Sequence, residues 1–104
     1  MVLTAHITSA YDPSNCFSVV TETTGITSSK DVTINSSIPV AGAIAVSDWY
    51  GGKVIHYSRV IGIYDDGQVM IYECGVPKLH KGGCGFRILG SSTNEEIIGY
   101  HVIP

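Results

Sequence analysis

Residues 42–73 constrain the fold most, because they contain two β-rich runs separated by a reversal signal. Residues 54–63 are rich in β-branched and aromatic side chains, an Asp-Asp-Gly turn signal follows shortly after them, and residues 68–73 are again β-rich. The pattern predicts a hairpin. A run of small and apolar residues at 42–46 predicts a further strand before it, joined to the hairpin by a glycine-rich turn.

This predicted hairpin places one histidine and one glutamate on the same face, because side chains alternate between faces along a strand. If the turn takes four residues, Ile63 pairs with Gln68, and counting outward sets Glu73 opposite Ser58 on the face that carries His56. Glu73 is then a diagonal neighbour of His56, within reach of its side chain. An imidazole held by a carboxylate is oriented for general-base work. The alternative is a half-buried histidine and an exposed glutamate on an ordinary hairpin.

Composition bounds the size and the class of the protein. The 104 residues are 44% apolar and only 14% charged, which predicts one folded domain over residues 1–104 with one modest core. The net charge of -3 and scattered Lys and Arg residues give no basic stripe for nucleic acid. No apolar run approaches the roughly 20 residues of a membrane span. Residues 1–6 are too short and polar for a secretory signal, so we expect no membrane span and no export signal.

A short helix is predicted near the start of the chain. Ser14 or Asn15 can cap its beginning and Gly25 can stop it. Cys16 then lies in the first turn, where the free backbone amides favour thiolate over thiol and can donate to an oxyanion. The alternative is that Cys16 is a small buried hydrophobe beside Phe17.

Two further strands are predicted at residues 85–89 and 97–103. One helix followed by five or six antiparallel strands indicates an α+β domain, with the cysteine-bearing helix packed against the sheet.

The remaining cysteines allow several interpretations. Cys74 and Cys84 could close a small loop, but cysteines in a chain without an export signal are more often reduced thiols. Cys74, His80 and Cys84 resemble metal ligands only superficially, since their spacing is loose and a fourth ligand is missing; we expect no metal. His80 lies between two nearby lysines and is predicted to be a solvated loop residue.

Cysteine on an early helix, histidine on a strand and an acid on the next strand is the order of parts in papain-like thiol hydrolases. The chain resembles the CHAP family of these enzymes, the cysteine- and histidine-dependent amidohydrolases and peptidases that cut bacterial peptidoglycan. The resemblance covers nearly the whole chain in short motifs. They are YDPSNC at residues 11–16, PVAGAIAV at 39–46, a Trp- and Gly-rich turn before His56, the acid Glu73 seventeen residues later, and the closing residues 98–100 with a final proline.

The resemblance implies a papain-like fold and a cysteine peptidase or amidase that needs no metal or organic cofactor. By it, Cys16 is the nucleophile, His56 is the base and then the acid, and Glu73 orients His56. The implied substrate is an amide bond of peptidoglycan, cut as an endopeptidase or as an N-acetylmuramoyl-L-alanine amidase.

The resemblance also implies roles around the triad. Tyr11 would lend its hydroxyl to the oxyanion site beside the Cys16 amide, and Trp49 and Tyr50 would line the substrate groove. The chain departs from the family at Ala43, where many members have aspartate, and at Arg59, which needs a solvent-facing or paired position. The segment between the cysteine and the histidine is also short.

Two other classes stay open at this stage. The chain could be a catalytically silent papain-like module that binds wall fragments, or a structural part of a phage particle. Small size and the missing signal suit a phage enzyme of the endolysin kind, acting from the host cytoplasm on the cell wall or attached to the virion. A monomer is favoured, although the sequence leaves the oligomeric state undecided.

Overall fold

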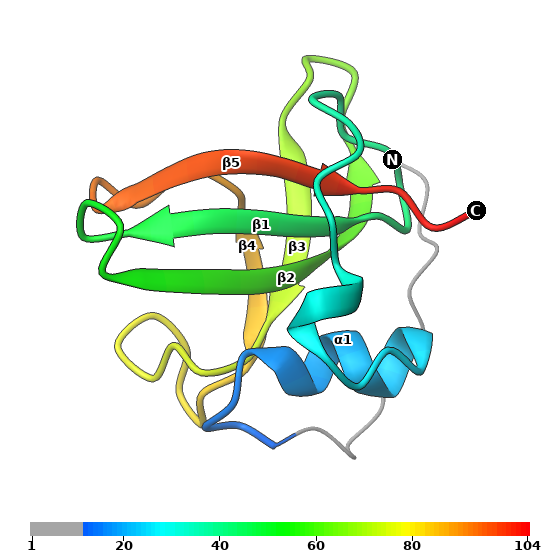
Figure 1. Ribbon diagram of the computed structural model, residues 1–104. Coiled ribbons are helices and arrows are strands. Elements are labelled where there is room, and N and C mark those ends of the chain that lie inside the picture. The colour runs from blue at the N-terminus through cyan, green and yellow to red at the C-terminus, as the bar shows by residue number, and fades with distance from the viewer. Residues whose placement is uncertain (1–11) are drawn as a thin grey trace.

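The computed structural model describes residues 12–104, which form one helix packed on a five-stranded antiparallel sheet (Figure 1). This confirms the predicted α+β class and the order of helix first and strands after. The strand order in the sheet is β4-β3-β2-β1-β5. The elements are α1 (Phe17–Thr24), a short 3-10 helix η1 (Ser29–Asp31), β1 (Ile44–Trp49), β2 (Val54–Ile63), β3 (Val69–Glu73), β4 (Gly85–Ile88) and β5 (Glu95–His101). No helix among residues 12–104 is both long and apolar enough to cross a membrane.

The limits of α1 follow from local hydrogen bonds. The N-cap residue is Cys16, whose side chain makes no capping bond, so the predicted cap at Ser14 or Asn15 was wrong. The side chain of Asn15, one residue earlier, still accepts a hydrogen bond from the Phe17 N–H at 2.9 Å. Gly25 takes a left-handed conformation with φ of 80° and donates its N–H to the Thr21 carbonyl, so the helix ends there as predicted. Its buried residues are Val19 and Val20, and α1 packs against β2, which brings the start of the helix to the sheet.

The turn between β2 and β3 is one residue longer than predicted. Ile63 pairs with Val69 rather than with Gln68, so the predicted pair was wrong. The connection contains an inner turn in which the Gly67 N–H donates to the Tyr64 carbonyl. The Gln68 N–H donates to the Asp66 carboxylate. Side-chain hydrogen bonds of this kind lengthen a turn in a way that strand periodicity does not report.

A bulge in β2 then restores the predicted alignment. The register shifts between Val60 and Gly62, and from there Arg59 pairs with Tyr72. Continuing this ladder sets Ser58 opposite Glu73, as the four-residue turn would have done. The extra residue in the turn and the extra residue in the bulge therefore compensate for each other, and the predicted register holds near His56.

The sheet is strongly twisted, so that β3 and β4 run nearly across β1 and β5 (Figure 1). The apolar core draws on both parts of the sheet and consists of Ala43, Ala45, Val60, Val69, Ile71, Leu89 and Tyr100. Arg59 is nearly buried and donates through Nε to the Gly42 carbonyl at 2.7 Å, so of the two positions open to it, solvent-facing or paired, it has the paired one.

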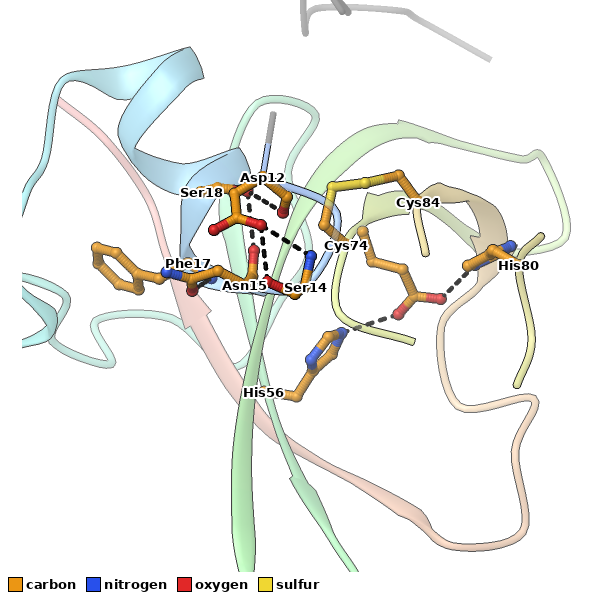
Figure 2. The surroundings of a disulfide bond; sticks show 10 residues. Asp12, Ser14, Asn15, Phe17, Ser18, His56, Cys74, His80 and Cys84 are labelled. Atoms are coloured by element: carbon orange, nitrogen blue, oxygen red, sulfur yellow. Dashed lines mark hydrogen bonds and ion pairs between the residues drawn. A yellow bond between two sulfur atoms is a disulfide. The ribbon is translucent and has the colours of Figure 1, made fainter. Parts of the chain in front are cut away.

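A disulfide joins Cys74 to Cys84, next to the paired residues Glu73 and Gly85 (Figure 2). Of the two states that the sequence left open for these cysteines, the structure therefore has the disulfide: the β3–β4 pairing brings the two Cα atoms within 4.0 Å, which sequence spacing alone does not reveal. The disulfide closes a loop of residues 75–83, the clamp loop. This loop packs against the segment before α1, where the Gly75 N–H donates to the Pro13 carbonyl at 3.0 Å.

Candidate active site

Cys16 lies immediately before α1, where the chain passes the clamp loop. It is partly exposed, and it is the free cysteine of the structure. A Cβ atom on Gly75 would come within 3.0 Å of the Cys16 backbone nitrogen, so glycine is required for the clamp loop to approach this closely. The position of Cys16 is therefore set from two sides, by the helix start and by the loop.

His56 and Glu73 meet as the sheet register predicts. The His56 Nε2 atom lies 2.9 Å from the Glu73 Oε1 atom, and the dashed line that starts at the His56 ring in Figure 2 marks this hydrogen bond. His56 is 5% exposed and Glu73 is fully buried. The alternative of an exposed glutamate on an ordinary hairpin does not describe this pair.

His56 also lies close enough to the Cys16 thiol for the two groups to shift each other's pKa. Burial acts to raise the pKa of Cys16, but the hydrogen bond to His56, a backbone hydrogen bond at Tyr57 and the imidazole charge bring it below its usual value. For His56, burial acts to lower the pKa, and the bonds to Cys16 and Glu73 raise it to about 9. Because Nε2 is held by Glu73, Nδ1 is the ring nitrogen left for the sulfur. The arrangement favours a thiolate–imidazolium pair.

Glu73 binds two groups besides His56. The His80 Nε2 atom lies 2.8 Å from Oε2, and Arg87 donates to both carboxylate oxygens through Nε and Nη2. Burial acts to raise the pKa of Glu73, but the hydrogen bonds from Arg87, His56 and His80 lower it to about 2. The carboxylate is therefore ionised at any pH at which the protein would work.

Sequence reasoning missed His80 and Arg87. His80 was predicted to be solvated, but its side chain is only 11% exposed because the clamp loop folds it onto Glu73. Arg87 is bound to Glu95 as well, with Nη1 2.7 Å from Oε1 and Nη2 2.9 Å from Oε2. The signal in the sequence was Arg87 itself, a lone arginine within a short β-rich run, which could have indicated a buried charge with a partner.

A cavity of about 320 Å³ opens beside His56. Trp49 and Tyr50, the two residues predicted to line the groove, both form part of its wall. Trp49 is nearly buried. Its ring and the His56 ring meet edge-to-face, with 5.8 Å between centroids, and the Arg87 guanidinium lies 5.3 Å from the Trp49 ring centre. The other lining residues are Val54, residues 75–79, Ser92 and Asn94.

Tyr50 is more exposed than Trp49, at 51%, and its φ of 56° is unusual for a bulky residue. Its N–H donates to the Asn94 carbonyl at 2.9 Å, which ties the β1–β2 turn to the segment before β5. The strained backbone thus holds an aromatic ring at the mouth of the cavity.

Tyr11, predicted to support the oxyanion, lies outside the described residues, so its role stays a prediction. No group of three or more His, Cys, Asp and Glu side chains within residues 12–104 has an arrangement that could hold a metal ion.

Comparisons with protein-family models, with curated proteins and with solved structures found no match for this chain.

The reactivity of Cys16 should depend on pH in two steps. We expect iodoacetamide to alkylate Cys16 at a lower pH than an ordinary thiol, because the pKa of Cys16 is lowered and its thiolate forms earlier. The rate should fall as acidification protonates the thiolate. It should change again near pH 9, where His56 loses its proton and the sulfur loses its cationic partner.

The measurement is mass spectrometry of the alkylated Cys16 peptide at a series of pH values, without reductant so that Cys74 and Cys84 stay bonded. Free cysteine, with a pKa of about 8.5, is the reference thiol. A Cys16 profile that follows the reference would show that His56 does not act on the sulfur.

Proposed function

We propose that this chain is a CHAP-type thiol hydrolase that cleaves an amide bond of bacterial peptidoglycan. The observation that carries the proposal is the placement of His56 between the Cys16 thiol and the buried Glu73 carboxylate. A nucleophile, a base and a group that orients the base are the parts that acyl transfer through a thiol requires.

The reaction follows from the positions of these groups. The Cys16 thiolate attacks the amide carbonyl, and the resulting oxyanion is placed beside the Cys16 backbone amide and, by the family resemblance, the Tyr11 hydroxyl. Imidazolium at His56 gives its proton to the leaving amine as the C–N bond breaks. His56 then takes a proton from water, which attacks the thioester and releases the acid and the Cys16 thiolate.

Glu73 is suited to orient His56 rather than to exchange protons with it. Its pKa of about 2 keeps it ionised, and Arg87 neutralises much of its charge. The carboxylate therefore accepts the Nε2–H of His56 and directs Nδ1 to the sulfur throughout the reaction.

Peptidoglycan as the substrate rests on the family resemblance, and the cavity agrees with it. Its wall combines apolar and aromatic side chains with the polar Ser92 and Asn94, a lining suited to a short peptide stem that adjoins a sugar. We further propose that the protein reaches the wall as a phage enzyme, either from the host cytoplasm or on the virion.

The test is hydrolysis of purified peptidoglycan from a panel of Gram-positive and Gram-negative bacteria. We expect release of new primary amines, and mass spectrometry of the products identifies the bond: glycan stripped of peptide indicates an amidase, and cut stems or cross-bridges indicate an endopeptidase. Protein alkylated at Cys16 with iodoacetamide is the matched control and should release none.

Equal amine release by the alkylated protein would contradict the thiol mechanism. Binding to the walls without amine release, across the whole panel, would instead identify a silent binding module.

A further inference from the structure

The clamp loop places a second histidine, His80, on the Glu73 carboxylate. His80 Nε2 lies 2.8 Å from Glu73 Oε2, while His56 Nε2 lies 2.9 Å from Oε1, so the two rings hold opposite oxygens of one carboxylate (Figure 2). The Cys74–Cys84 disulfide closes this loop directly beside Glu73. His80 is thus brought to Glu73 by a short covalent ring.

The His80 ring occupies space that is available only because residue 85 is glycine. A Cβ atom on Gly85 would lie 2.4 Å from His80 Nδ1 and 2.9 Å from Cε1, closer than side chains can approach. Gly85 is also the residue that pairs with Glu73 between β3 and β4. Glycine at this position therefore leaves the space in which the imidazole lies next to Glu73.

The bonds to Glu73 leave it little freedom. A carboxylate offers roughly four lone-pair sites, and four donors meet them here: His56 and Arg87 Nη2 at Oε1, His80 and Arg87 Nε at Oε2. Without His80, Oε2 keeps only its bond from Arg87 Nε. The carboxylate can then turn toward the guanidinium and away from His56.

We propose that His80 is a positioning residue of the proposed hydrolase: by holding Glu73 Oε2, it keeps Glu73 Oε1 directed at His56. This inference rests on the proposed function, but its physical content, the coupling of His80 to His56 and Cys16 through Glu73, can be measured without a substrate. His80 contacts Glu73 and acts on Cys16 only through Glu73 and His56.

The test uses two variants that remove the contact in different ways. His80→Leu removes the donor, and Gly85→Ala displaces the ring while every polar side chain stays in the protein. His80→Gln, which can place an amide N–H near the position of Nε2, is the conservative variant. His101→Gln is the matched control, because His101 binds the Thr33 carbonyl and has no bond to the site.

We expect His80→Leu and Gly85→Ala to lower kcat on peptidoglycan about tenfold with little change in KM, the loss that corresponds to about one pKa unit of lost interaction. The His56 ring, followed by NMR, should titrate at lower pH than about 9 in both variants. The pH range over which Cys16 alkylation is fast should narrow from both ends. His80→Gln should keep kcat, the His56 titration and the Cys16 alkylation profile close to those of the wild-type protein. His101→Gln should leave all three unchanged.

An unchanged His56 titration and Cys16 alkylation profile in folded His80→Leu or Gly85→Ala protein would overturn the proposal. A loss of stability with both profiles unchanged would assign His80 a structural role only, and so would overturn it too. Failure of the proposed function appears differently: wild-type protein would cleave no wall, while the titration of His56 would still report whether His80 acts on it.

Discussion

Replacing Cys16 with alanine should abolish peptidoglycan hydrolysis and leave the protein folded. The sulfur is the proposed nucleophile, and no other thiol of the structure is free to replace it, because Cys74 and Cys84 are bonded to each other. Cys16 is the residue before α1 and is partly exposed, so the loss of its sulfur leaves no large cavity. The expected fall in kcat is on the order of 10⁵-fold or more, below detection in a wall-clearing assay.

Substitution of His56 should reduce the activity as much as substitution of Cys16, and substitution of Glu73 should reduce it less. His56→Ala removes the base and the acid together and should also abolish clearing. Glu73→Gln keeps an oxygen that can accept from His56, so its activity should fall less, on the order of 10²-fold. Measured kcat values for the three variants on one wall preparation would test this order.

His101→Ala is the matched control for His56→Ala, because it also removes a histidine from a strand. It should clear walls at the wild-type rate, and circular dichroism should show that all variants keep the sheet. Undiminished clearing by Cys16→Ala would rule out the thiol mechanism.

Replacing Arg87 with leucine should produce the largest loss of stability. Arg87 binds the fully buried carboxylate of Glu73 and, with two nitrogens, the buried carboxylate of Glu95. Its removal leaves these two carboxylates without the cation that they share. Removing one partner of a buried ion pair costs about 3–5 kcal/mol, a large share of the 5–15 kcal/mol by which domains are stable.

Urea unfolding followed by tryptophan fluorescence measures this free energy, since Trp49 lies against Arg87. Lys53→Leu, which removes a cation from an exposed turn, is the matched control and should change the free energy of unfolding by less than about 0.5 kcal/mol. The free energy of unfolding of Arg87→Lys should lie between those of the other two variants, because lysine keeps the charge but loses the paired geometry of the guanidinium. A free energy for Arg87→Leu equal to that of Lys53→Leu would show that the network does not stabilise the fold.

Local sequence signals predicted the helix and all five strands, but not all their bounds: β1 continues to Trp49, beyond the predicted residues 42–46, and β5 begins at Glu95, before the predicted residues 97–103. Gly25 ends α1 as predicted, because a left-handed cap depends on neighbouring backbone groups, whereas the start was predicted one residue early, with Cys16 and not Asn15 at the N-cap. The alternation of side chains in β2 predicted that His56 faces the site, because the two-residue period of a strand is intrinsic to its backbone.

The contact of His56 with Glu73 was predicted correctly, but from a turn length that was wrong. The turn contains one residue more than expected, and the bulge at Ile61 removes the difference. A bulge depends on how two strands twist against each other, so the residues of one strand do not reveal it.

The sequence by itself determined the α+β class, the helix end at Gly25 and the strand face of His56, because each follows from hydrogen bonds and periodicity within a few neighbouring residues. Only the tertiary structure decided that Cys74 bonds to Cys84 and that His80 and Arg87 meet on Glu73. These contacts form between separate loops and strands, and their distances are set by the twist of the whole sheet and by the clamp loop packed against it.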